Sequence, residues 1–315
     1  MMYDKTRFTD KQLLGQGTYG KVYKAKDNLE GQDVAIKIMK LEQEENGISQ
    51  SNLREVSIMK SIDHPNLLRI KDVFFERNMI LIISEFIKYD VYNYMYCKLR
   101  KPLNEQLICS YAFQLLCGLF HLHSHRIVHR DLKLANLLID SEGMIKICDF
   151  GLSRYFTVPL GKYTPDVISE YYRPIELLYG DKIYDISVDI WSLGCCLAEM
   201  SRGRPLFYSD SNIDLLHKIV QVLGMPTEDD LPDFPREWIK NPEEIVPLDL
   251  KKVLNTNNDY FVDLISKMLI YNPSKRITAL EALKHPYFEP LKTSKSQRVR
   301  EIIKKCWPKE VPLDI

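Results

Sequence analysis

The sequence lacks a net charge, and this absence limits the partners to expect. Its 315 residues contain 43 Lys and Arg and 43 Asp and Glu. A strongly positive chain would favour nucleic acid or an acidic membrane surface, and a balanced chain has no such field. We therefore expect neither nucleic acid nor a membrane among the partners of this protein.

Long apolar runs are also absent. No segment reaches the roughly 20 uninterrupted apolar residues that cross a bilayer. The longest candidate, residues 108–122, contains Ser110, Gln114 and His121 and is typical of a buried amphipathic helix. The first residues carry no apolar region of the kind found in signal peptides. We expect a location in the nucleus, the cytoplasm or both.

The seven cysteines include no Cys-x-x-Cys pair. Most of them lie in apolar runs, which predicts reduced core side chains rather than a structural zinc site. Cys148 differs because it directly precedes Asp149. It either lines a cleft or fills a small packing space.

The size and composition are those of a globular protein that can form two unequal parts. Hydrophobic residues make up 45% and charged residues 27% of the chain, which are ordinary values. A chain of this length can form one large core or two lobes that share a cleft. Residues 1–87 are predicted to be mostly strand with one helix. The rest is mainly helical, with helices predicted at 188–200, 212–223, 259–269 and 278–284.

Residues 127–151 place polar groups between short apolar runs. The runs at 127–128, 137–139 and 145–147 predict short buried strands. Two acids, an amide and a lysine at the strand ends are poor candidates for burial without a ligand. They indicate a site for a divalent metal and a phosphate, made by Asp131, Lys133, Asn136 and Asp149. A plain hairpin turn explains residues 140–143 but not these four groups.

A glycine pattern, Gly15-Gln16-Gly17-Thr18-Tyr19-Gly20, precedes the first metal-site residues by about a hundred positions. Its spacing would also suit a dinucleotide-binding turn, which requires a helix to begin at the glycines. Here a strand pattern follows, so we predict a hairpin tip whose backbone N–H groups can approach phosphate oxygens. Lys37 ends the next strand pattern and either serves the same phosphates or is an exposed strand lysine.

These motifs give a resemblance that covers nearly the whole chain. The order His-Arg-Asp (129–131), Asn136 and Asp-Phe-Gly (149–151) matches the catalytic and metal-binding loops of eukaryotic protein kinases. The sequence resembles the cyclin-dependent protein kinases, within the larger group that includes the mitogen-activated and glycogen-synthase kinases. Segments of the second half fit the same pattern, at 188–194, 204–207, 272–277 and 285–288.

The resemblance implies an α+β, bilobal protein-kinase fold with the active site in the cleft. The small, mainly β N-lobe would span residues 1–87 and carry one regulatory helix. The larger, mainly α C-lobe would span 88–288, so that one kinase domain covers about 8–288. Residues 289–315 would form a C-terminal extension.

The resemblance also implies ATP and Mg²⁺ as cofactors and gives roles to particular residues. Asp131 would accept or orient the hydroxyl proton of a protein Ser or Thr, Lys133 would bind the γ-phosphate, and Asn136 and Asp149 would hold Mg²⁺. Lys37 would hold the α- and β-phosphates, positioned by Glu55; taken alone, Glu55 would be a solvated helix acid. The expected contacts of ATP are Leu14, Gly15, Gln16, Gly17, Thr18, Tyr19, Gly20, Val22, Ala35, Lys37, Ser84, Glu85, Ile87, Asp90 and Leu138.

Regulatory positions follow from the same resemblance. Thr164 corresponds to an activating phosphothreonine, which an upstream kinase would modify, and Thr18 and Tyr19 correspond to inhibitory phosphorylation sites. Charge-assisted bonds from arginines can order a phosphorylated loop. The family's three arginines correspond to Arg54, Arg130 and Arg154.

Two further segments concern partners. Residues 49–55 stand where the family's helix meets a cyclin, and only the Arg54-Glu55 end, Ser49, Ser51 and Leu53 resemble it. Val167, Ile168 and Arg173 resemble the residues that accept a proline after the target Ser or Thr. The resemblance thus implies a cyclin-like activator and proline-directed protein substrates.

Four departures concern the family branch rather than phosphotransfer. Ser84 replaces the usual phenylalanine at the end of the hinge strand and should open a pocket behind the adenine. Residues 174–176 read Pro-Ile-Glu instead of Ala-Pro-Glu, which leaves Glu176 available to pair with Arg276. Residues 169–173 lack the usual tryptophan, and Leu134 replaces a proline.

Three functional hypotheses follow. The first is a Ser/Thr kinase that depends on a cyclin and on phosphorylation of Thr164, in cell-cycle or transcription control. The second keeps the kinase activity but drops the cyclin, because the helix that would meet it is altered. The third is a catalytically inactive scaffold, which the presence of every expected catalytic group disfavours.

Overall fold

The computed structural model describes residues 6–17, 20–40, 43–44, 47–48, 62–76, 79–150, 153–155, 170–178, 185–209, 211–232 and 234–308. Several predicted residues lie outside these ranges, namely Thr18, Tyr19, Arg54, Glu55 and Thr164, together with the segments 49–61 and 167–169. The structure describes the backbone of Gly17 and of Arg154, but neither the burial of these two residues nor any side-chain contact that they make.

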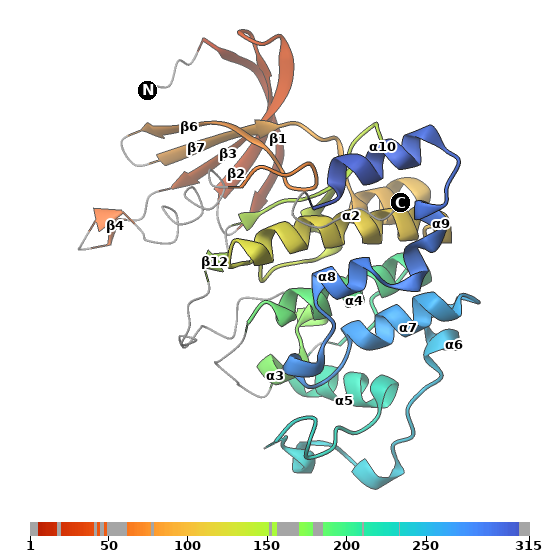
Figure 1. The fold of residues 1–315 in the computed structure, drawn as a ribbon. Coiled ribbons are helices and arrows are strands. Elements are labelled where there is room, and N and C mark those ends of the chain that lie inside the picture. Colours follow the sequence, from red (N-terminus) through yellow and green to blue (C-terminus); the bar gives the residue numbers. More distant parts are fainter. Residues whose placement is uncertain are drawn as a thin grey trace.

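The first part of the chain forms a five-stranded antiparallel sheet with the strand order β1-β2-β3-β7-β6. In Figure 1 this sheet stands apart from the helical part of the molecule. Its strands are β1 (Phe8–Gly17), β2 (Gly20–Asp27), β3 (Gln32–Lys40), β6 (Ile70–Glu76) and β7 (Met79–Glu85), and the short strands β4 (Gln43–Glu44) and β5 (Gly47–Ile48) pair with each other.

The alternation of side chains along β3 shows how the sheet faces two environments. Val34 and Ile36 are fully buried in the core of this lobe, together with Phe74 and Ile83. Successive side chains of a strand point to opposite faces. Ala35 and Lys37 therefore point to the other face, where they are only partly buried.

The glycine pattern forms the predicted hairpin tip. β1 and β2 pair antiparallel up to Gly17 and Gly20, with no helix at the glycines. Gly20 has a φ of 137°, and a Cβ there would lie 2.0 Å from the carbonyl oxygen of Ile38. Glycine is therefore required at this position for the approach to β3 as well as for the turn.

Two long buried helices form the centre of the second part. They are α2 (Glu105–Ser124) and α4 (Ser187–Arg202). α2 is long and apolar enough to cross a membrane by length and composition, but 72% of its most apolar window is buried inside the protein. It is a core helix, as its interrupted apolar pattern predicted.

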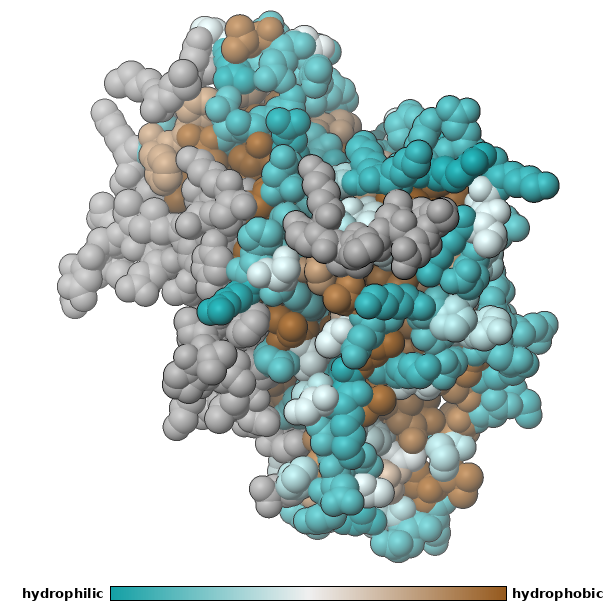
Figure 2. Space-filling model, viewed as in Figure 1, coloured by the Kyte–Doolittle hydropathy of each residue, from teal (hydrophilic) through white to brown (hydrophobic). Residues whose placement is uncertain are grey.

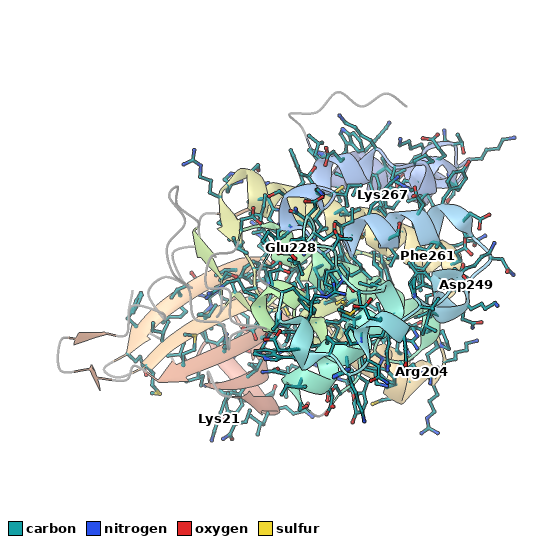
Figure 3. The ribbon with its side chains drawn as sticks, turned by 90° about the horizontal axis from the view of Figure 1, so that it is seen from below. Lys21, Arg204, Glu228, Asp249, Phe261 and Lys267 are labelled. Carbon is teal, nitrogen blue, oxygen red and sulfur yellow. The ribbon has the colours of Figure 1, made fainter. Side chains whose placement is uncertain are left out.

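The remaining helices surround this pair, and the four predicted helices are confirmed to within two residues at each end. Figure 3 separates the two parts from another side: Lys21 lies beside the sheet, and Arg204, Asp249 and Lys267 lie around the helical part. These helices are α3 (Ile175–Leu178), α5 (Asn212–Leu223), α6 (Leu250–Leu254), α7 (Asp259–Met268), α8 (Ala279–Leu283), α9 (Glu289–Lys292) and α10 (Gln297–Cys306).

Residues 289–308 pack on this helical core. Ile303 and Cys306 on the inner side of α10 are buried, and the Trp307 ring stacks on Phe113 of α2 with centroids 5.9 Å apart. Five of the seven cysteines are buried and all are free thiols, whereas Cys97 is exposed and Cys148 is half-buried. Burial raises the pKa of the Cys109 and Cys306 thiols to about 12.

Short strands and helical turns connect the sheet to the helical part and lie between them. The three predicted short strands are present as β9 (Ile127–Val128), β10 (Leu137–Ile139) and β11 (Ile145–Ile147). β10 lies between β11 and β8 (Tyr89–Asp90), and β9 pairs with β12 (Arg154–Tyr155). A π-helix η1 (Asn93–Leu99) and 3₁₀ turns complete the chain: η2 (Leu134–Asn136), η5 (Glu170–Tyr172), η6 (Arg236–Trp238), η7 (Pro242–Glu244), η8 (Pro273–Lys275) and η9 (Pro286–Phe288).

Candidate active site

Asp189 holds the loop that contains Asp131 in place through hydrogen bonds to the loop backbone. This aspartate lies in the first turn of α4 and is completely buried. Its two carboxylate oxygens accept the backbone N–H groups of His129 at 2.8 Å and Arg130 at 2.9 Å. The His123 ring lies 3.0 Å from the same carboxylate.

The protonation of Asp189 follows from these contacts. Burial opposes its charged form, but the hydrogen bond and the charge of His123 outweigh burial and hold the pKa of the carboxyl below its usual range. Asp189 is therefore a buried anion that fixes two consecutive peptide groups next to Asp131.

His129 joins this loop to the loop that carries Asp149. Its Nδ1 accepts the backbone N–H of Asp131 at 3.2 Å, and its Nε2 lies 3.0 Å from the carbonyl oxygen of Cys148. Because Nδ1 is an acceptor, Nε2 must be the protonated nitrogen that donates to the carbonyl. The ring also packs edge-on against buried Phe150, with centroids 5.3 Å apart. One histidine thus sets the relative position of Asp131 and Asp149.

Two of the predicted residues, Lys133 and Asn136, converge on the carboxylate of Asp131. Lys133 Nζ lies 2.8 Å from Asp131 Oδ2. The Asn136 amide nitrogen donates to the same oxygen at 2.9 Å and to the backbone carbonyl of Asp131 at 2.7 Å. Asp131 is only 5% exposed, so these donors hold a nearly buried carboxylate in one orientation.

Lys37 and Asp149 meet across the two parts of the molecule. Lys37 extends from β3 of the sheet, and its Nζ lies 2.9 Å from Asp149 Oδ1. Burial opposes the charged form of Asp149, but the nearby Lys37 outweighs it and holds the pKa of the carboxyl below its usual range. The predicted pairing of Lys37 with Glu55 concerns a residue outside the described part of the chain.

Two residues of the site have a backbone that non-glycine residues rarely adopt. Arg130 has a φ of 71° and Asp149 a φ of 64°. Such left-handed residues are uncommon and cluster at functional sites, where the surroundings compensate their strain. Here the compensation for Arg130 is visible in the bond from its own N–H to Asp189.

The donor atoms near Asp149 fit a magnesium ion shared with phosphate. The amide of Asn136 uses its nitrogen for Asp131, which leaves its oxygen as a ligand, and Asp149 offers carboxylate oxygens. Magnesium prefers oxygen ligands and is commonly held by one or two protein groups together with phosphates. Within the described ranges, no three His, Cys, Asp or Glu side chains form a metal group by themselves. The residues therefore suit a metal that arrives with a phosphate.

The predicted adenine contacts come from the sheet and from β10. Val22 and Ala35 of the sheet are partly buried, and Leu14 is 49% exposed. Leu138 of β10 is partly buried between two buried neighbours, Leu137 and Ile139, and so points to the opposite face of its strand.

The segment between the two parts holds the other predicted contacts. Ser84 pairs with Ala35 in the sheet, is buried, and its hydroxyl donates to the carbonyl oxygen of Glu85 at 3.3 Å. Ile87 follows the end of β7 and is partly buried. The Asp90 carboxylate accepts the backbone N–H of Asn93 at 2.8 Å at the start of η1.

Sequence reasoning missed several residues that shape this site. Asp189 and His129 were noticed only as parts of motifs, and the ion pair from Lys146 to Glu85 at 2.7 Å was not foreseen. An acid in the first turn of an otherwise apolar helix is the signal that could have identified Asp189. The pairing of Glu176 with Arg276 was foreseen and is confirmed, as a buried two-bond contact at 3.0 and 3.1 Å.

A β-sheet lobe and a helical lobe, with a lysine from one and polar loop residues from the other meeting between them, define the bilobal kinase fold. Residues 8–288 match the family model described as "Protein kinase domain". Because this match covers most of the chain, the protein belongs to the protein kinase family.

Proposed function

We propose that this protein is an ATP-dependent Ser/Thr protein kinase of the cyclin-dependent type, activated by a cyclin-like partner and by phosphorylation of Thr164. The observation that carries the proposal is the convergence of Lys133 and Asn136 on Asp131, next to the Lys37–Asp149 pair. Phosphoryl transfer depends on positioning and charge neutralisation rather than on covalent chemistry, and this arrangement provides both.

Each of the site residues has a separate role in the proposed phosphoryl transfer. Asp131 accepts or orients the proton of the substrate hydroxyl, and Asn136 keeps its carboxylate in place. Lys133, whose side chain is 31% exposed, contributes positive charge beside the attacking oxygen. Lys37 contributes the second positive charge from the opposite lobe.

The implied cofactors fit the same residues. ATP supplies the phosphoryl group, and Mg²⁺ held by Asn136 and Asp149 neutralises phosphate charge when bound. Lys37, now paired with Asp149, lies where it can turn to the phosphates. The partly buried Val22, Ala35 and Leu138 offer an apolar space of the kind that binds an adenine ring.

Support for the cyclin-dependent type is the resemblance of the sequence, together with a physical argument. Arg130 is 3% exposed and directly precedes Asp131, so a phosphate that it contacted would be coupled to the catalytic loop. Glu55 stands on the segment that resembles the cyclin-binding helix, and such an element can switch a site when a partner holds it in place.

The experiment measures phosphate transfer from ATP to a generic protein acceptor, followed by identification of the phosphorylated amino acid. We expect only phosphoserine and phosphothreonine, a low rate for the isolated chain, and a rise of at least about tenfold when a cyclin and an upstream kinase are added. Thr164→Ala should remove most of the part of the rise that the upstream kinase produces.

The same experiment separates the alternatives. Full activity of the isolated, unphosphorylated chain would favour a kinase that needs no cyclin. Phosphotyrosine would contradict the Ser/Thr assignment. No transfer with any acceptor or partner, despite a measurable nucleotide affinity, would indicate a scaffold.

A further inference from the structure

The last helix carries an unbalanced positive charge on its solvent side. α10 exposes Arg298, Arg300, Lys304 and Lys305 and only one acid, Glu301. Among the residues that the structure describes, none of these four cations forms an ion pair; Arg300 donates only to the backbone oxygen of Lys295. The chain as a whole is neutral, so this surface is a local excess, and Figure 2 shows its strongly hydrophilic side chains.

A cavity of about 560 Å³ opens at the end of this helix, behind the segment that links the lobes. Its walls come from the residues before β6, the α2 helix, the end of α10, Glu85 at the end of β7 and Lys146 of β11. The residues that matter here are His64, Arg69, Phe120, His121, Lys305 and Trp307. A cavity of this size can enclose a large side chain and its neighbours.

The rim of the cavity offers positive charges without partners. The side chains of Arg69 and Lys305 are exposed and have no hydrogen bond or ion pair with any described residue. Lys146, a third cation of the wall, is by contrast paired with Glu85 at 2.7 Å. Asp63 is the other acid of the wall and is exposed. Two charges are thus available to an acidic ligand.

Two aromatic side chains, Trp307 and Phe120, form part of the cavity wall. Trp307 is partly buried and rests on Phe113, which fixes the plane of its ring. Phe120 of α2 is also partly buried and lines the same space. A rigid aromatic surface of this kind favours an aromatic or aliphatic side chain.

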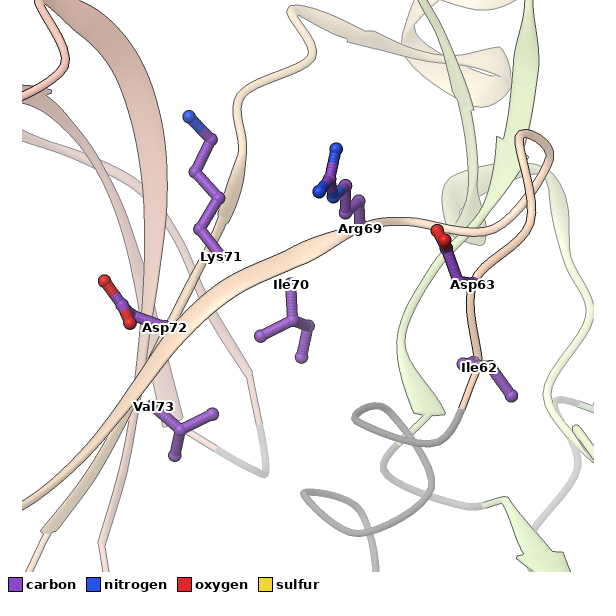
Figure 4. A pocket seen from close by; sticks show the side chains of 7 residues that line it. All are labelled: Ile62, Asp63, Arg69, Ile70, Lys71, Asp72 and Val73. Carbon is purple, nitrogen blue, oxygen red and sulfur yellow. The ribbon is translucent and has the colours of Figure 1, made fainter.

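Arg69 directly precedes an irregularity in β6. The register of β6 against β7 shifts between Ile70 and Asp72, as in a β-bulge. Such a bulge re-aims the side chains around it. Figure 4 shows Ile70 and Val73 on one side of the strand and Arg69 and Lys71 on the other, and all four residues line a second cavity.

We propose that the exposed basic side of α10 and this cavity together form a docking surface for an acidic segment of a protein partner. The segment places one aromatic or aliphatic side chain against Trp307 and sets carboxylates against Arg69 and Lys305. Charge complementarity favours an acidic ligand. The aromatic surface of Trp307 and Phe120 favours a peptide side chain, because a nucleic-acid backbone or a lipid headgroup would use the cations and leave the cavity unfilled.

The test uses the full chain and a fluorescein-labelled peptide of about 12 residues, rich in Asp and Glu, with one central Phe, read by fluorescence anisotropy. We expect saturable binding that weakens as salt rises. Arg69→Gln combined with Lys305→Gln should raise Kd by at least about tenfold, and replacing the peptide Phe by Ser should do the same.

The matched control is Lys252→Gln, which removes one charge from an exposed position on α6. Lys252 lies near Asp249, which Figure 3 labels on the helical part. This variant should leave Kd unchanged. An equal Kd for the double variant and the unmodified chain would overturn the proposal, and so would no binding of the peptide.

Three further probes distinguish other occupants. Tighter binding of a single-stranded oligonucleotide, or of vesicles that contain phosphatidylserine, would overturn the choice of a protein partner. The residues after Pro308 lie outside the described part of the chain and are tested by a variant that ends there. If only this shortened variant binds the peptide, the chain's own end is the occupant and the proposal fails.

Discussion

The two sides of the cleft differ in how firmly the rest of the protein holds them. On the C-lobe side, Asp131 is nearly buried and its loop is bonded to Asp189 of a buried helix. On the N-lobe side, β1 ends in the glycine hairpin, where Leu13 and Leu14 are 51% and 49% exposed. The groups for chemistry are thus fixed in the core, and the residues that would cover a nucleotide lie on a surface hairpin.

Because of this difference, we expect substitutions on the two sides of the cleft to affect folding stability and nucleotide binding separately. Residues held by buried hydrogen bonds should affect both folding and catalysis when changed, because the same contacts serve both. Residues on the exposed hairpin should affect nucleotide binding with little effect on folding. The following substitutions test the separation.

Asp189→Asn should have the largest effect on stability. The substitution removes the charge and one acceptor from the two backbone N–H groups and from His123. We expect a loss of about 3 kcal/mol in the free energy of unfolding, measured by urea denaturation, together with a fall of kcat of at least about a hundredfold.

Asp249→Asn is the matched control. Asp249 caps α6 by accepting the backbone N–H of Lys251 and is exposed. Asparagine caps a helix about as well as aspartate, so the unfolding free energy should change by less than about 0.5 kcal/mol. Equal effects of the two substitutions would contradict a special role for Asp189.

Ser84→Phe tests the buried position behind the proposed adenine site. Ser84 is buried and pairs with Ala35, so a phenyl ring at this position would occupy the space behind the proposed adenine site. We expect ATP-site inhibitors with bulky aromatic extensions to bind Ser84→Phe at least about tenfold more weakly than the unmodified chain. Isothermal titration calorimetry measures this, and equal affinities would dispose of the idea.

Leu14→Ala should produce a smaller and purely local effect. Half of this side chain is exposed, so its removal should change the unfolding free energy by less than about 0.5 kcal/mol. The KM for ATP should rise by about threefold to tenfold while kcat stays nearly constant, as expected for lost uniform binding. A large loss of stability would show that the hairpin is held as firmly as the catalytic loop.

The smallest expected effect is a pH dependence. The pKa of Asp189 is below its usual range in the folded state. Its contribution to stability is therefore fully present above the unfolded-state pKa of about 3.9 and is lost as pH falls through the folded-state value. Urea midpoints should show no contribution from the titration of Asp189 between pH 7 and about pH 4, and below about pH 4 they should fall less steeply for Asp189→Asn than for the unmodified chain. Parallel curves would contradict the assignment.

Local patterns were enough to predict much of this molecule. The short strands at 127–128, 137–139 and 145–147 and the helix at 212–223 agree with the structure residue by residue. The hairpin at Gly17 and Gly20 was distinguished from a helix start by the strand pattern that follows. Such features depend on neighbouring residues, so a sequence reveals them.

The contacts between distant residues could not be predicted in the same way. Lys37 and Asp149 are 112 positions apart, and Glu85 and Lys146 are 61 apart. The resemblance placed Lys37 and Asp149 in one site but did not show that they form an ion pair with each other. The docking cavity could not be predicted either, because its walls combine residues from the loop before β6, β7, α2, β11 and the end of α10.

The most direct test of the central claim is the rate of phosphate transfer after Asp131→Asn. Asparagine keeps the shape of the side chain but cannot accept a proton, and the protein should remain folded. We expect kcat to fall by about a thousandfold with the affinity for ATP nearly unchanged. An unchanged kcat would show that the loop fixed by Asp189 and His129 is not where the chemistry occurs.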